Sequence, residues 1–190
     1  EDRVDTNPAA HFLRIGQPLP KELIGYRSST EGQEERSAPG PLAVRPDDLP
    51  ALTSDARGAH LAPADYLTLA LLPGRLRELG VRFVTLDPSV RYMDPGFRHE
   101  LPAILNGLDA FIPSESEVKG FYRSERENLW EMAEGFTAMG CRCVVIKCGA
   151  SGQLVWDASA RRQWHVPAYP ATIRDVTGAG DAFCGGFLAG

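Results

Sequence analysis

The sequence lacks the features that would place the protein in a membrane or on nucleic acid. No apolar run approaches the roughly 18 residues that a membrane-spanning helix needs. Acidic residues outnumber basic ones by 25 to 20, so the formal net charge is −5 and there is no basic surplus to attract nucleic acid or anionic lipid. No basic segment followed by an apolar one opens the chain. We therefore predict no nucleic-acid partner, no membrane partner and a cytoplasmic location.

Cysteine is scarce, with four residues in the chain: Cys141, Cys143, Cys148 and Cys184. The C-x-C pair at Cys141 and Cys143 could indicate a metal, but no second Cys/His pair follows at zinc-like spacing. The alternative is that these are small apolar residues of a buried strand in a reducing compartment, and this is the interpretation we favour.

Other absences limit the class of protein further. The G-x-x-x-x-G-K-[ST] pattern of the P-loop does not occur, and there are no internal repeats. The composition, 43% hydrophobic and 24% charged, is that of an ordinary globular protein of one domain with at most a small appendage. The chain starts with Glu1 instead of Met and stops inside an apparent helix, so we expect it to be a fragment.

The first sixty residues differ from the rest. Two short stretches, HFLRI (11–15) and PLAVRP (41–46), are consistent with strands, and the polar segment 26–41 between them is rich in turn formers. This pattern indicates a surface flap. We assign residues 1–58 to this flap and residues 59–190 to the core.

From His60 onward, helical and strand patterns alternate. The apolar spacing predicts helices over 66–80, with Pro73 kinking or dividing it, over 97–108 and over 124–140. Strands are predicted over 81–87, 109–113 and 143–147, and a hairpin over 153–157 and 162–167. Such alternation predicts an α/β fold with a mostly parallel sheet, which binds ligands at the carboxyl ends of its strands. Polar or glycine-rich residues follow strands at 87–91, 113–117 and 147–152.

The segment DVTGAGDAFCGGFLAG (175–190) carries the strongest chemical signal. If a helix begins near Asp181, the amides of Ala179, Gly180 and Asp181 converge on one point, where glycines let an anion approach. A phosphoryl group in transfer suits such a site, and Asp181 could accept a proton from an attacking alcohol. The alternative is a helix-capping turn with no chemistry.

The whole run resembles the C-terminal signature of the ribokinase-like carbohydrate kinases, the phosphofructokinase-B type family. The resemblance implies a mostly parallel, Rossmann-like sheet flanked by helices, with residues 1–58 in a small β-stranded lid. It further implies that Asp181 is the catalytic base and that Gly178, Ala179 and Gly180 form the anion hole. In the family, the residues at Asp175 and Thr177 can help bind a monovalent cation such as K⁺; the alternative is that they only hold the loop.

Two upstream stretches resemble other parts of the family's site. VVIKCGASG resembles the strand and loop beside the nucleotide, which implies that Lys147, Gly149 and Gly152 belong to the nucleotide site. The alternatives are an ordinary lysine at a strand end and two turn-forming glycines. Many family members have threonine at the position of Lys147, although a lysine would suit a polyphosphate.

IPSESEV resembles the family's N-x-x-E segment, so Glu117 is a magnesium candidate and Ser114, which replaces the asparagine, a candidate for the phosphate and metal side. Glu117 as a solvated residue of a helix's first turn is the alternative. DPSVR resembles a D-x-N-x-R stretch of several sugar kinases, with Asp87 and Arg91 matching and Ser89 departing. A structural Asp–Arg pair explains that match as well as contact of these residues with substrate or phosphate does.

The resemblance implies an ATP-dependent, Mg²⁺-requiring kinase that phosphorylates a primary alcohol of a sugar or related polyol, which is a small-molecule substrate. A nucleoside or vitamin-like alcohol as the acceptor is one alternative, and a catalytically silent, kinase-like binding or scaffold protein is another. By analogy with the fold, the edge of the lid is a candidate homodimer surface.

Overall fold

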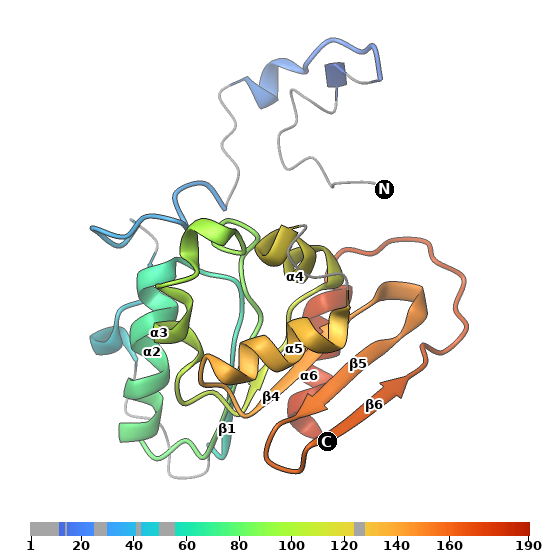
Figure 1. The fold of residues 1–190 in the computed structure, drawn as a ribbon. Helices are drawn as coiled ribbons and strands as arrows, with labels where there is room; N and C mark the ends of the chain where they lie inside the picture. The colour runs from blue at the N-terminus through green and yellow to red at the C-terminus, as the bar shows by residue number, and fades with distance from the viewer. Residues whose placement is uncertain (1–11, 14, 25–29, 41–42, 50–55, 124–127) are drawn as a thin grey trace.

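The computed structural model describes residues 12–13, 15–24, 30–40, 43–49, 56–123 and 128–190. At its centre is a six-stranded sheet in the order β1-β2-β3-β4-β5-β6 (Figure 1). The strands are β1 (Gly58–Leu61), β2 (Phe83–Leu86), β3 (Ala110–Phe111), β4 (Cys143–Lys147), β5 (Gln153–Asp157) and β6 (Arg162–Val166). Because β1 to β4 pair in parallel and only the β4–β5 and β5–β6 pairings are antiparallel, the predicted α/β fold with a mostly parallel sheet is confirmed.

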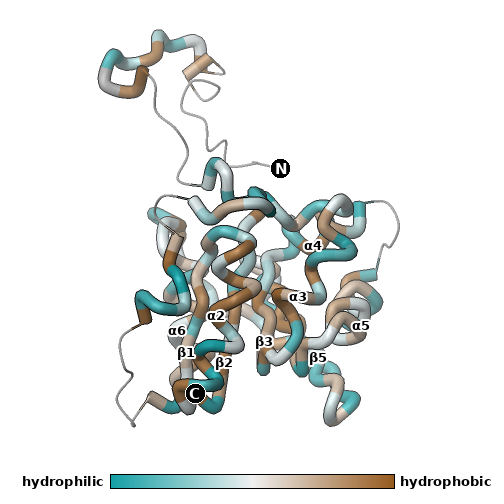
Figure 2. The backbone as a smooth tube through the Cα atoms, turned by 90° about the vertical axis from the view of Figure 1, so that its left-hand side faces the viewer, coloured by the Kyte–Doolittle hydropathy of each residue, from teal (hydrophilic) through white to brown (hydrophobic). Residues whose placement is uncertain are grey.

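Helices lie on both faces of the sheet. The helices are α2 (Tyr66–Glu78), α3 (Leu101–Leu105), α4 (Glu115–Tyr122), α5 (Leu129–Ala138) and α6 (Ala179–Ala189). Along β4, Val144 and Ile146 belong to the large core that includes residues of α2 to α5, whereas Val145 packs in a small cluster with Cys184 of α6. This alternation follows from the two-residue period of a strand. Hydrophobic residues accordingly concentrate along the central strands in Figure 2.

Several element boundaries differ from the prediction. Helix α2 is not divided at Pro73, which is buried within it. The helix predicted over 97–108 is shorter, because a 3-10 turn (Pro95–Phe97), in which Asp94 accepts a hydrogen bond from the Gly96 amide, precedes α3. Strand β1 was not predicted. Among the described residues, no helix is long and apolar enough to cross a membrane.

The strand predictions in the flap are wrong for the residues that the structure describes there. Phe12 and Leu13 are helical, and 43–45 lead into a 3-10 turn (Pro46–Asp48). The Arg45 amide donates to the Asp48 carboxylate (2.8 Å), so a local side-chain cap replaces pairing with a strand. Ile15 lies in a turn, residues 11, 14, 41 and 42 lie outside the described part, and the division into a lid and a core stays a prediction.

The predicted hairpin is confirmed, and two glycines shape the turn that leads into it. Gly149 (φ +56°) and Gly152 (φ +88°) both have the left-handed backbone that favours glycine. They differ in their surroundings. A Cβ on Gly149 would meet no described atom within 4 Å, whereas a Cβ on Gly152 would lie 2.1 Å from the Val166 carbonyl oxygen. Gly152 therefore has a packing role that is independent of any ligand.

We expect Gly152→Ala to destabilise the fold far more than Gly149→Ala. Both substitutions place alanine at a positive φ, which costs about 1–2 kcal/mol. Only the first also forces backbone atoms of the hairpin apart, at an additional cost of roughly 1–3 kcal/mol. Urea unfolding of the two variants and the wild type measures the difference, and equal losses would show that the close approach at Val166 is not a constraint.

Candidate active site

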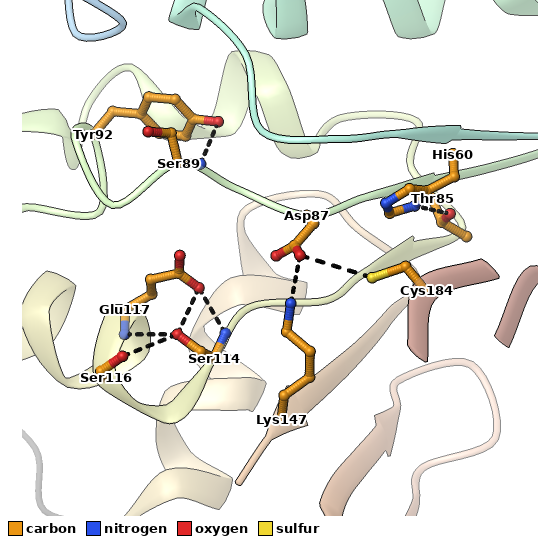
Figure 3. Close-up of polar contacts among 10 residues, drawn as sticks. All are labelled: His60, Thr85, Asp87, Ser89, Tyr92, Ser114, Ser116, Glu117, Lys147 and Cys184. Carbon is orange, nitrogen blue, oxygen red and sulfur yellow. Dashed lines mark hydrogen bonds and ion pairs between the residues drawn. The ribbon is translucent and has the colours of Figure 1, made fainter. Parts of the chain in front are cut away.

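The carboxyl ends of three neighbouring parallel strands bring the predicted polar segments together. Asp87 follows β2, Ser114 follows β3, and Lys147 ends β4. Ser114 and Lys147 also form an isolated parallel β-bridge. The three segments predicted at the ends of strands therefore lie at one edge of the sheet, as Figure 3 shows.

Asp87 pairs with Lys147 and not with Arg91. The Lys147 ammonium lies 2.5 Å from Asp87 Oδ2, and the two side chains are only 17% and 8% exposed. The Arg91 Nε instead donates to the Thr30 hydroxyl (3.2 Å). The suggested Asp87–Arg91 pair is thus wrong, because the strand ends place an ammonium nearer to the carboxylate. The interpretation of Lys147 as an ordinary lysine at a strand end is incomplete, because its ammonium forms a largely buried ion pair with Asp87.

Glu117 lies in the first turn of α4 and forms a capping box with Ser114. Its Oε2 accepts hydrogen bonds from the Ser114 amide and hydroxyl, both at 2.7 Å, and its own amide donates to the Ser114 hydroxyl (3.3 Å). Burial raises the pKa of Glu117 and outweighs the opposing effect of these hydrogen bonds. The position in the first turn is therefore as suggested, but the side chain is partly buried and not fully solvated.

A surface pocket of about 380 Å³ lies beside this edge. It is lined by the start of α4, by the end of β4 and by the turn after it: Ser114, Glu115, Ser116, Lys119, Lys147, Cys148 and Gly149. Lys119 forms an ion pair with Glu115 one helical turn away (2.5 Å). Three predicted nucleotide-site residues, Ser114, Lys147 and Gly149, are thus brought together, whereas Gly152 is not among the lining residues.

Helix α6 starts two residues before Asp181, with Gly178 as its N-cap in the left-handed conformation (φ 74°). Asp181 is an exposed residue of the first turn. The Ala179 amide donates to the Val176 carbonyl (3.1 Å), so this amide is engaged within the turn. Helix geometry leaves the amides of Gly180 and Asp181 without an intrahelical acceptor. The role of all four residues as an anion hole with a base stays a prediction.

Asp175 and Thr177 form a local turn before α6. The Thr177 amide donates to Asp175 Oδ1 (2.9 Å), and this hydrogen bond lowers the pKa of the Asp175 carboxyl. The geometry agrees with the suggested loop-holding role. Their suggested role in binding a monovalent cation stays a prediction.

Sequence reasoning missed two residues at the edge. Cys184 was interpreted only as a small apolar residue, but its thiol lies 3.7 Å from Asp87 Oδ2. His60 lies in β1, one residue before the end of that strand. Its Nδ1 is 2.8 Å from the Thr85 hydroxyl oxygen, and burial lowers the pKa of the His60 imidazole. No sequence pattern would have identified either residue, because both depend on contacts between distant segments.

The cysteines are free and burial raises their pKa values: to about 12 for Cys141 and to about 11 for Cys143 and Cys184. Among the described residues, no group of three or more His, Cys, Asp or Glu side chains is arranged to hold a metal ion. Of the C-x-C pair, Cys143 is the first residue of β4 and partly buried, whereas Cys141 is buried but lies two residues before the strand.

Comparison with known proteins identifies a family of carbohydrate kinases and several individual kinases as relatives. The family model described as pfkB family carbohydrate kinase matches residues 75–190. Cytidine kinase of Thermococcus kodakarensis is 33% identical over 144 residues, covering 75% of this chain and 50% of the relative. Aminoimidazole riboside kinase of Salmonella typhimurium is 32% identical over 192 residues, covering 93% of this chain and 58% of the relative. Fructokinase of Klebsiella pneumoniae is 30% identical over 164 residues, covering 78% and 50%.

Solved structures of kinases share the fold of this chain. Aminoimidazole riboside kinase from Salmonella enterica superposes with a TM-score of 0.62 at 25% identity, covering 77% of this chain and 51% of that one. An E. coli protein assigned as Ribokinase II, solved in complex with ATP and Mg²⁺, gives a TM-score of 0.59 at 25% identity, covering 76% and 48%. The chain thus spans about half the length of the relatives it matches. With a ribokinase-like fold and a family match over residues 75–190, the chain belongs to the pfkB family of carbohydrate kinases.

Proposed function

We propose that the full-length protein is an ATP-dependent kinase that transfers the γ-phosphoryl group to a primary alcohol of a sugar or related polyol. The observation that carries this proposal is the position of the N-terminus of α6 beside the polar edge of the sheet. A Cβ built on Gly180 would lie 3.6 Å from the Lys147 ammonium, so the first turn of α6 adjoins the strand ends directly. Unpaired amides, a carboxylate and a polar pocket therefore lie within one region of the molecule.

In the proposed reaction, the Asp181 carboxylate accepts the proton of the acceptor hydroxyl. The hydroxyl oxygen forms a bond to the γ-phosphorus while the bond between that phosphorus and the β–γ bridging oxygen breaks, so that ADP leaves. The amides of Gly180 and Asp181 donate to the phosphoryl oxygens, on which negative charge is spread during transfer. Gly178, with its left-handed backbone, is the N-cap of the helix whose first turn carries these amides.

The pocket beside α4 suits the nucleotide's phosphates. Lys119 lines it beside its partner Glu115, and Ser114 and Gly149 line it as well. Lys147 also lines it, with its ammonium paired to Asp87. The relative assigned as Ribokinase II was solved with ATP and Mg²⁺, which supports the same nucleotide and metal here.

The residues present fit Mg²⁺ as it is usually held in kinases, by one or two carboxylates together with substrate phosphates and water. Glu117 would hold it, with Ser114 at its side, because one carboxylate oxygen takes both Ser114 hydrogen bonds and the other points away from Ser114 in Figure 3. The ion would neutralise charge on the β- and γ-phosphates. The cytoplasmic location, the lid-mediated homodimer and the monovalent cation at Asp175 and Thr177 stay predictions.

A nucleoside acceptor is the second candidate. Two of the relatives above are named for nucleoside substrates, cytidine and aminoimidazole riboside, at 33% and 32% identity. Both acceptor classes offer a primary alcohol to the same base. A catalytically silent binding protein would keep nucleotide binding without turnover.

We expect Asp181→Asn to lower kcat of the full-length protein by about 10²–10⁴-fold, because the amide cannot accept the proton. Initial rates with saturating ATP and acceptor measure this. Asp157→Asn is the matched control: it removes a carboxylate in the hairpin turn, where Asp157 Oδ1 accepts from the Ser159 and Ala160 amides and an amide oxygen can do the same. An Asp181→Asn enzyme as fast as the control would refute the assigned base.

We expect Glu117→Gln to raise the Mg²⁺ concentration needed for half-maximal rate by roughly tenfold or more, because one metal-binding charge is removed. The fold should survive, since glutamine also serves in a capping box. Titration of activity with Mg²⁺ measures the first effect. Glu78→Gln, at the end of α2 and in an ion pair with Arg75, is the control.

The same variant predicts a pH effect on stability. Because burial raises the pKa of Glu117 in the folded state, its ionisation disfavours folding above the ordinary pKa of a glutamate. The stability associated with the neutral carboxyl is fully present at low pH and is lost as the pH rises through the folded-state pKa. Wild type should therefore gain stability relative to Glu117→Gln between pH 7 and pH 4, as measured by thermal unfolding. A difference that does not change with pH would contradict the raised pKa.

A panel of acceptors separates the two substrate classes. We expect turnover with sugars or polyols that carry a primary alcohol, and the same Asp181→Asn loss for every accepted substrate. Turnover with nucleosides alone would select the second candidate. Nucleotide binding by calorimetry without turnover of any alcohol would select the silent binding protein.

A further inference from the structure

The proposed reaction leaves one buried charged group without a role. Asp87 directly follows β2 and is 6% exposed, within the polar edge and next to the first turn of α6. A buried carboxylate is costly unless it is paired and hydrogen-bonded. Beside a site that is to receive phosphates it carries a second cost, because like charges repel. The contacts of Asp87 should therefore explain why a buried carboxylate is present beside the proposed phosphoryl site.

Asp87 Oδ2 accepts from two different elements (Figure 3). The Lys147 ammonium of β4 lies at 2.5 Å and the Cys184 thiol of α6 at 3.7 Å. Burial keeps the Cys184 thiol protonated at neutral pH, with its pKa raised to about 11, so the thiol can act as the donor. One carboxylate oxygen thus joins the end of β4 to the helix that carries Asp181, one turn before Cys184.

The pair lies against the backbone of that helix. A Cβ built on Gly180 would be 3.6 Å from the Lys147 ammonium and 3.8 Å from Asp87 Oδ2, which is ordinary van der Waals contact. The amide next in line, that of Asp181, is one of the two proposed donors to the phosphoryl group. A displacement of the Asp87–Lys147 pair would therefore also displace the first turn of α6, which carries the amides proposed to bind the phosphoryl group.

Lys147 lines the pocket, yet its ammonium is directed at Asp87. With 17% of its side chain exposed, it neutralises the carboxylate. Removal of one partner of such a pair leaves an uncompensated buried charge, which is more damaging than removal of both partners. This asymmetry makes the role of Lys147 measurable.

We propose that Asp87 is a positioning residue that fixes the first turn of α6 against the ends of β2 and β4, and that the main task of Lys147 is to neutralise Asp87 beside the phosphoryl site. This inference rests on the proposed kinase function. It differs from the simpler role of Lys147 as a direct ligand of the nucleotide's phosphates. If Lys147 were a direct phosphate ligand, Asp87 would only weaken the interaction of Lys147 with the phosphates. Removal of Asp87 would then not restore kcat in a variant that already lacks Lys147.

The test is a double-mutant cycle in the full-length protein with Lys147→Met, Asp87→Asn and the two combined. We expect Lys147→Met to lower kcat by roughly 10- to 100-fold, because an unpaired carboxylate then faces the phosphoryl group. Adding Asp87→Asn should restore kcat to within about fivefold of the wild type. Asp87→Asn alone should lower kcat a few-fold while KM for ATP stays the same or falls, since an ammonium remains and only its anchor is lost.

A structural pair at the opposite edge of the sheet is the control. Arg77 and Asp109 form an ion pair (2.7 Å) with side chains 34% and 15% exposed, between α2 and the segment before β3. The cycle of Arg77→Met and Asp109→Asn should shift the midpoint of thermal unfolding but leave kcat of the folded protein within about twofold. If Lys147→Met does not fold, Lys147→Gln, which keeps a hydrogen-bond donor, takes its place in the same cycle.

The outcomes are distinct. A combined variant as slow as Lys147→Met overturns the inference and leaves Lys147 as a direct phosphate ligand, with the kinase function intact. Coupling that is seen in the unfolding midpoint but not in kcat also overturns it, because the pair is then only structural. A wild-type protein that transfers no phosphoryl group to any alcohol overturns the proposed function, and this inference with it.

Discussion

Parallel pairing of β1 to β4 is the constraint on which the candidate site depends. In a parallel sheet all strands end at one edge, so residues that follow them meet without any further device. Asp87, Ser114 and Lys147 come from positions up to sixty residues apart in the sequence and yet lie within one small region. Helix α6, on the opposite face from α2 to α5, then needs only to start at the same edge to add its amides to the group.

This constraint also explains the burial of charge at the edge. The residues directly before Asp87 and Lys147 are apolar and fully buried: Leu86 and Ile146 are both 0% exposed. A polar residue that follows such a position lies next to an environment without water. Asp87 and Lys147 can be accommodated there because each is the other's counter-ion, and Glu117 because Ser114 supplies two hydrogen bonds.

The alternation of elements could be predicted from the sequence because it depends on local periodicity. The run CVVIK, with three consecutive fully buried residues, is the clearest case. Strand β1 could not be predicted from the sequence, since its four residues GAHL include a glycine and a histidine and show no strand-like alternation of their own. It forms because β2 offers a parallel edge and because Gly58 leaves room for Leu188 of α6, a contact made across 130 residues. At residues 12–13 and 43–46, which the structure describes, the suggested strands fail for the converse reason, because a short apolar stretch does not form a strand without a partner strand to pair with.

The site was predictable in its location but not in its pairings. The end-of-strand rule identified three of the segments, and the G-A-G-D run identified the start of α6 within two residues. That Asp87 would take Lys147 in place of the nearby Arg91 depends on which ammonium or guanidinium the fold brings closest, and sequence distance favoured the wrong one. The pairing matters for the chemistry because Asp87, Glu117 and Asp181 together would give this edge an excess of negative charge over Lys147. A nucleotide, itself an anion, can bind there only if that excess is reduced. The Asp87–Lys147 pair removes one negative charge, so less repulsion between the site and the nucleotide remains for a metal ion at Glu117 and the amides of α6 to offset.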